Sequence, residues 1–222
     1  MKTVSAAGWA GTTFSTTKTF MLIIGFAALS LALKEVPIVD SLLQPLETFE
    51  TAVHEMGHAL ACIATGGSVD GLTIVNDGAG HGGLTFCQGG WPFVYSQAGY
   101  IGEALFGCSL ILLSRFQRLS RAILVFIGVA IGLGSLMLMP GTIFHQGDWF
   151  AGLASMVWGL CIAAAFVLFG AKLPDKWAHL LLLFVAVQST LGSLSGIWVL
   201  LLQSFGLFPG SWSDATNMQK LT

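Results

Sequence analysis

Long uninterrupted apolar stretches are the feature that most limits what this chain can fold into. Residues 122–139, 149–170 and 177–203 contain no Asp, Glu, Lys or Arg. A run of about 20 apolar residues is long enough to cross the hydrocarbon core of a bilayer. Only 9% of all residues are charged, whereas a soluble domain carries about 25%, so polar side chains could not cover a water-exposed surface. The sequence therefore predicts an integral, multi-pass membrane protein.

The predicted fold is an all-α polytopic membrane domain with about five transmembrane helices, a short motif-bearing helix and a small β-hairpin. Residues 1–18 are rich in Ser, Thr and Gly and are predicted to be a flexible N-terminal segment. Residues 19–222 are predicted to form a single membrane-embedded domain. Its expected spans are residues 19–33, 93–114, 122–139, 149–170 and 177–203.

Basic residues cluster in two of the turns between the predicted spans. Arg115, Arg118 and Arg121 lie in one turn, and Lys172 and Lys176 lie in another. The positive-inside rule places both turns in the cytoplasm, which for a bacterial protein indicates the cell (inner) membrane. Span parity then places the hairpin, the PGTIFHQGD connection and the C-terminal tail together on the opposite face. The side of the N-terminus depends on whether the motif helix crosses the membrane.

The segment VHEMGHALACIATGG carries the strongest chemical signal in the chain. His54 and His58 are four residues apart, so on a helix both imidazoles project from one face and can bind one zinc ion at about 2.0–2.1 Å. Glu55 lies beside them and can take a proton from a zinc-bound water. This H-E-x-x-H spacing is typical of zinc metallopeptidases. Ionisable groups are costly in lipid unless they are paired or functional, so the sequence predicts a zinc site with Glu55 as the catalytic base.

Proline and glycine residues suggest where the motif helix begins and ends. It is predicted to begin near Pro45, since proline is well placed in a first helical turn, and to end at Gly66-Gly67, where glycine can adopt a left-handed cap. A polar, glycine-rich segment follows and is typical of a β-hairpin over about residues 69–90. Its two strands are predicted at residues 72–75 and 84–87.

Zinc requires a third protein ligand, with one position left for water. Asp148 and Asp214 are the main candidates, because both fall on the predicted face of the motif. Each also has an ordinary interpretation, Asp148 as an acid at a helix N-terminus and Asp214 as a cap in a solvated tail. His81 and His145 are also candidates, although each is expected to be an ordinary polar residue of a loop.

The cysteines and one further acidic residue are also considered as candidate functional residues. Cys62 follows the histidines closely and is a minor candidate ligand, whereas Cys108 and Cys161 lie in apolar spans and are interpreted as small hydrophobic residues. Glu103 interrupts an apolar span, and an intramembrane carboxylate is by default a functional candidate. We expect Glu103 to be protonated, paired with a histidine or exposed to a water-filled cavity.

These segments together resemble the site-2 protease family of intramembrane zinc metallopeptidases, and within it a small peptidase-like branch. The resemblance runs through VHEMGHALACIATGG, GGLTFCQGG and AGYIGEALFGCSLILLS and resumes at SDATNMQKLT, covering roughly half of the chain. It implies that His54 and His58 are zinc ligands and that Glu55 is the catalytic base. It also implies that peptide bonds of membrane-associated proteins are the target.

The sequence departs from that family at the third ligand. The better-known members take it from an Asp in an LDG-type segment, and no LDG occurs here. Asp148 matches that segment only in its order along the chain, whereas Asp214 matches the SDA segment of the small branch and is therefore the first choice. The branch is also expected to continue into another apolar helix, whereas this chain stops at Thr222.

The predicted function is regulated intramembrane proteolysis: hydrolysis of membrane-protein or peptide substrates by a water that Zn²⁺ activates, within the lipid bilayer. The alternative is a non-catalytic relative that binds or sorts membrane proteins. A di-iron bundle enzyme would need a second E-x-x-H motif and a transporter an internal repeat, and the sequence shows neither. The formal net charge of −2 gives no basic surface for nucleic acid. Neither the substrate nor the oligomeric state follows from the sequence.

Overall fold

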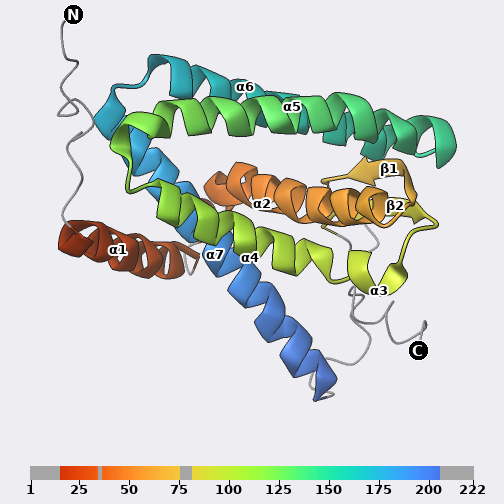
Figure 1. Cartoon of the computed structure of the whole chain (residues 1–222), viewed down its shortest axis with the longest axis horizontal. Coiled ribbons are helices and arrows are strands. Elements are labelled where there is room, and N and C mark those ends of the chain that lie inside the picture. Colours follow the sequence, from red (N-terminus) through yellow and green to blue (C-terminus); the bar gives the residue numbers. More distant parts are fainter. Residues whose placement is uncertain (1–15, 35–36, 76–81, 206–222) are drawn as a thin grey trace, which may run out of the picture.

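Long helices make up most of the part of the chain that the computed structural model describes, which is residues 16–34, 37–75 and 82–205 (Figure 1). The flexible segment predicted for residues 1–18 therefore lies almost entirely outside the described residues. In chain order the elements are α1 (Thr16–Lys34), α2 (Pro37–Ala64), β1 (Ser68–Thr73), β2 (Leu84–Gln88), α3 (Pro92–Tyr95), α4 (Ala98–Leu113), the 3₁₀ helix η2 (Gln117–Leu119), α5 (Ser120–His145), α6 (Trp149–Lys172) and α7 (Asp175–Ser204).

Three helical segments in the described part of the chain are long and apolar enough to cross a membrane, namely Gln117–His145, Trp149–Lys172 and Asp175–Trp198. The apolar helices Thr17–Ser30 and Ala98–Leu113 are shorter. About five spans were expected, so three of them are matched by long helices and two by shorter ones.

Apolar side chains cover the outside of the long helices. Met137 of α5 is 76% exposed and Phe150 of α6 is 82% exposed. The interior is equally apolar where α5 packs along α6 and where α4 packs along α7 (Figure 1). A surface of this kind avoids water and suits a hydrocarbon environment. The predicted mostly-α membrane fold is therefore confirmed.

The two basic turns lie together at one end of the helical bundle, where Arg121 connects them. Its Nε donates to the carbonyl of Gly170 at 3.0 Å, and its Nη1 is 3.7 Å from a carboxylate oxygen of Asp175. The β-hairpin, α3 and the connection from α5 to α6 lie at the opposite end (Figure 1). This separation agrees with the predicted arrangement of the turns.

Helix α2, which carries the motif, lies between α4 and the α5–α6 pair (Figure 1). It begins at Pro37, so the predicted start near Pro45 is wrong, and Pro45 lies inside the helix. The first helical turn does contain a proline, but it is the earlier of the two, and the helix continues past Pro45 with one backbone hydrogen bond fewer. The end of α2 is as predicted, since Gly66 adopts a left-handed φ of 88° directly after it.

The predicted helix over residues 93–114 is broken into α3 and α4 at Ser96 and Gln97. The amide of Ser96 closes the short α3 by donating to the carbonyl of Pro92 at 3.0 Å. The chain then restarts as α4. This break turns the carbonyl of Tyr95 toward α2, where it meets the side chain of a motif histidine at 2.6 Å.

Strands β1 and β2 form a two-stranded antiparallel sheet beside the motif. Its register pairs Leu72 with Thr85, and a bulge lies between Val69 and Gly71. The predicted hairpin is present, but β1 lies earlier in the chain than expected, and residues 76–81 lie outside the described part. The sheet is fixed to α5 by Thr142, whose hydroxyl donates to the carbonyl of Leu72 at 3.1 Å.

Candidate metal centre

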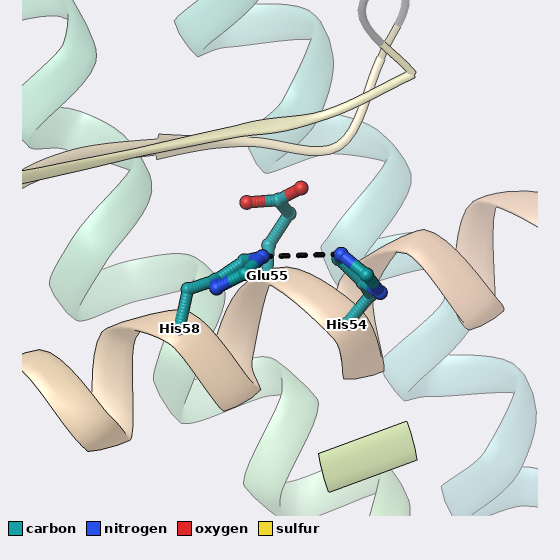
Figure 2. A group of neighbouring side chains, drawn as sticks. All are labelled: His54, Glu55 and His58. Carbon is teal, nitrogen blue, oxygen red and sulfur yellow. Dashed lines mark hydrogen bonds between the residues drawn. The ribbon is translucent and has the colours of Figure 1, made fainter. Parts of the chain in front are cut away.

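His54, Glu55 and His58 lie within about one turn of α2, and the two imidazoles converge (Figure 2). The Nε2 atoms of the two histidines are 3.1 Å apart. One ligand atom from each of the three residues lies within 4.8 Å of the other two. In the described residues this is the only such group of three or more His, Cys, Asp or Glu. The helical spacing of four residues thus brings the two imidazoles together, as their positions in the sequence imply.

Each histidine ring also has an oxygen atom near its other nitrogen, Nδ1. Nδ1 of His58 donates to the carbonyl of Tyr95 at 2.6 Å. Nδ1 of His54 lies 3.6 Å from Oε2 of Glu103. A backbone carbonyl can only accept, so the proton of a neutral His58 is at Nδ1 and the lone pair at Nε2. This is the tautomer that can bind a metal through Nε2.

The carboxylate of Glu55 points away from the two rings toward the hairpin (Figure 2). The hydroxyl of Thr85 on β2 lies 2.6 Å from Oε2 of Glu55 and 3.0 Å from its backbone oxygen. Glu55 is only 6% exposed. Strand β2 therefore fixes the direction of the predicted catalytic base, a role for Thr85 that sequence reasoning missed because 30 residues separate it from Glu55.

The residues present fit a zinc ion. Two imidazole nitrogens that bind one tetrahedral ion at about 2.0–2.1 Å lie about 3.3 Å apart, close to the 3.1 Å between the Nε2 atoms. Helix α4 approaches this point at Gly99. A Cβ atom at residue 99 would lie 2.3 Å from Nε2 of His54 and 2.5 Å from Nε2 of His58. Any side chain at residue 99 would therefore overlap both nitrogens.

The other candidate ligands do not join this group in the described part of the chain. Asp148 is exposed and caps α6, where its carboxylate accepts from the amide of Ala151 at 2.9 Å. Nδ1 of His145 donates to the carbonyl of Asp70 at 3.0 Å. Asp214, the first choice from the sequence, and His81 lie outside the described residues.

A family model described as Peptidase M50B-like matches residues 21–222 of the chain. The chain belongs to the Peptidase M50B-like family. This family is part of the site-2 protease family, so the predicted resemblance is confirmed. Its peptidases are generally zinc-dependent, in agreement with the donor atoms present here. The comparisons with curated proteins and with solved structures gave no match.

A disulfide bond joins the motif helix of this M50B-like chain to the hairpin. Cys62, one turn after His58, is bonded to Cys87 of β2, with 6.1 Å between their Cα atoms. The interpretation of Cys62 as a minor candidate ligand is therefore wrong, because its sulfur is already used. A signal was present, since the predicted helix end and the second predicted strand each carry a cysteine within four residues before a Gly-Gly pair.

A cavity of about 270 Å³ reaches the site of the M50B-like chain from α7. Its lining includes His54 and three acidic residues, one of which is Glu103. The lining residues are Glu47, Glu50, Thr51, His54, Glu103, Gly192 and Ser195. A second cavity of about 280 Å³ shares three of these residues and extends to α1. The two cavities therefore lie side by side between the site and α1, and the one nearer α1 is mostly apolar.

Proposed function

We propose that this chain is an intramembrane zinc metallopeptidase of the site-2 protease type, which hydrolyses peptide bonds of membrane-associated proteins. The observation that carries the proposal is the pair of Nε2 atoms 3.1 Å apart on one helical face, with the Glu55 carboxylate beside them. Membership of a peptidase family supports it. So does the apolar exterior of the helices around the site.

His54 and His58 would hold the ion through Nε2. When bound, zinc supplies a Lewis acid that makes a water molecule acidic enough to lose its proton near neutral pH. The carboxylate of Glu55 takes this proton as the oxygen attacks the peptide carbonyl, and returns it to the leaving amine nitrogen. The hydroxyl of Thr85 holds the carboxylate in one direction during both transfers. The cavity lined by Glu50 and Glu103 offers a route for water.

A substrate helix must unwind before its carbonyl can react, because helical hydrogen bonds occupy its backbone. In the described residues the β1–β2 sheet has two strands, so an unwound segment could add to it as a further strand. Thr85 belongs to this sheet and contacts Glu55. An added strand would therefore lie near the catalytic base.

The proposed orientation has the basic turns in the cytoplasm, in a multi-pass protein of the cell membrane if the source is bacterial. The disulfide between Cys62 and Cys87 supports this orientation. It lies at the end of the bundle opposite the basic turns (Figure 1), and disulfides persist mainly in oxidising compartments. The zinc site would then face the non-cytoplasmic half of the membrane.

Purified protein is expected to contain one zinc ion per chain and to cleave a membrane-protein substrate. A zinc chelator should stop the cleavage, and added zinc should restore it, because the histidines alone cannot activate water. Metal analysis and a gel-based cleavage assay with a panel of single-span substrates measure both. Cleavage that persists when no metal is detectable would contradict the proposal.

The third ligand is expected to be Asp214, with Asp148 as the alternative. Asp214→Ala should lower the zinc bound per chain at a limiting zinc concentration, since zinc sites hold the ion through three protein ligands. Asp148→Ala should retain zinc and lose only a helix cap, costing about 1 kcal/mol of stability. Metal analysis of both variants, with thermal unfolding in detergent as the second readout, decides between them. Loss of zinc in Asp148→Ala, with zinc retained in Asp214→Ala, would instead assign the third ligand to Asp148.

A non-catalytic relative that binds or sorts membrane proteins is the second candidate. One observation favours it: among the described residues, no carboxylate besides Glu55 joins the two histidines. In that case the metal would be purely structural. Substitution of Glu55 separates the two candidates, because a structural zinc site has no need of a base.

A further inference from the structure

Glu103 is a buried acidic residue on α4, a helix whose other residues are uncharged and mostly apolar. It is 4% exposed, and α4 contains no other charged residue. Removing a carboxylate from water is costly unless a partner compensates for the loss of hydration. The compensation has to come from residues that face α4, and one of these is His54, a predicted zinc ligand.

The two oxygens of Glu103 have different surroundings. Oε2 lies 3.6 Å from Nδ1 of His54, within reach of an ion pair but longer than a hydrogen bond. Oε1 faces Gly192 of α7: a Cβ atom built there would be 2.8 Å from it and 2.8 Å from Oε2 of Glu50. Gly192 therefore leaves room for both carboxylates, and Glu103 can stay beside His54.

The two histidine rings differ in what lies beside them. The Nδ1 of His58 is fixed by the carbonyl of Tyr95 at 2.6 Å. The ring of His54 packs edge-on against Tyr100, with 4.5 Å between the ring centroids. Tyr100 and Glu103 are three residues apart, so both project from the same face of α4 toward His54.

We propose that Glu103 is a positioning residue for the metal centre: its carboxylate accepts from Nδ1 of His54 and thereby directs Nε2 toward the ion. This inference rests on the proposed zinc site and extends it. Acceptors behind metal-binding histidines fix the tautomer and the ring orientation. A shift of about 0.5 Å would bring the contact to hydrogen-bond length. Glu103 does not coordinate the ion itself, because it lies at Nδ1, the opposite side of the ring from Nε2.

The test measures zinc affinity by competition with a chelating dye, using the full chain in detergent. Glu103→Leu keeps the size and the apolar character of α4 but removes the acceptor, so affinity is expected to fall about 10–100-fold. Glu103→Gln keeps an oxygen that can accept from Nδ1 and should recover most of the affinity. Ser195→Ala, which alters the same cavity from α7, is the matched control and should bind zinc as the wild type does.

A spectroscopic readout separates positioning from a general loss of structure. Cobalt in place of zinc gives visible absorption bands that report ligand geometry; Glu103→Leu is expected to change them and Glu103→Gln to leave them nearly unchanged. If Glu103→Leu does not fold, Glu103→Ala takes its place. Wild-type affinity and spectrum in the variant without an acceptor would overturn the inference, and so would equal losses in the Leu and Gln variants.

The outcomes also separate this inference from the proposed peptidase function. Wild-type protein that cleaves substrate, with undiminished zinc affinity in Glu103→Leu, rejects the positioning role alone. Wild-type protein that binds zinc without cleaving, with reduced affinity in Glu103→Leu, upholds positioning and rejects the peptidase. Wild-type protein that binds no zinc rejects both.

Discussion

Glu55→Gln is expected to lower the cleavage rate about 10²–10⁴-fold, the usual contribution of a general base, while zinc content stays near that of the wild type. The amide cannot take a proton from the attacking water. It still occupies the same volume and can still accept from the hydroxyl of Thr85, which lies 2.6 Å from Oε2 of Glu55. The two imidazoles that would hold the ion are unchanged.

Cleavage of a membrane-protein substrate and metal analysis of the same preparation measure the two effects. Asp175→Asn is the matched control, because it makes the same change of carboxylate to amide at the opposite end of the bundle. Cleavage by Glu55→Gln at the wild-type rate would reject Glu55 as the base. Zinc binding with no cleavage in either protein would favour the non-catalytic alternative.

Gly99→Ala is expected to lower zinc affinity on the order of 100-fold or more, at the upper end of what changes around metal ligands cause. A Cβ atom at residue 99 would be 2.3 Å and 2.5 Å from the two Nε2 atoms, far inside normal contact distance. The rings would have to rotate apart or α4 would have to move away from α2. Cleavage should fall in parallel, since the same ion supplies the Lewis acid.

Gly102→Ala is a stringent control for this effect. It lies on the same helix, and a Cβ atom there would have Gly57 as its nearest neighbour, at an ordinary 3.5 Å. Alanine is a better helix former than glycine at both positions, by about 1 kcal/mol, so loss of helix stability cannot explain a difference between them. Zinc affinity measured by competition should fall only in Gly99→Ala. Equal affinities would show that the ion does not bind between these nitrogens.

The geometry of the motif follows from the sequence because it depends on one helix. A spacing of four residues places His54 and His58 on one face wherever α2 lies, and the glycine cap after Ala64 is equally local. The start of α2 was missed for a related reason. Two prolines, Pro37 and Pro45, each suit a first helical turn, and tertiary packing rather than local preference decides between them.

The groups that support the motif could not be predicted from residue spacing within α2, because they belong to other helices and to the hairpin. Tyr95 contributes its backbone carbonyl, which has no signature in the residue type and becomes available only through the break between α3 and α4. Thr85 depends on the register of the hairpin, and the strand β1 was predicted several residues too late. The approach of Gly99 to the histidines depends on how α4 crosses α2, which the sequence of neither helix determines.

The bond between Cys62 and Cys87 restricts how the protein can open. It ties β2 to the last turns of α2, so the strand that carries Thr85 moves together with the helix that carries Glu55. Any opening movement at the hairpin would therefore have to displace β2 and the end of α2 together. The opposite flank has no disulfide in the described residues, and there α7 meets α2 and α4 along the cavity that contains Glu103. A polypeptide approaching from the bilayer is therefore expected to pass through the α7 flank.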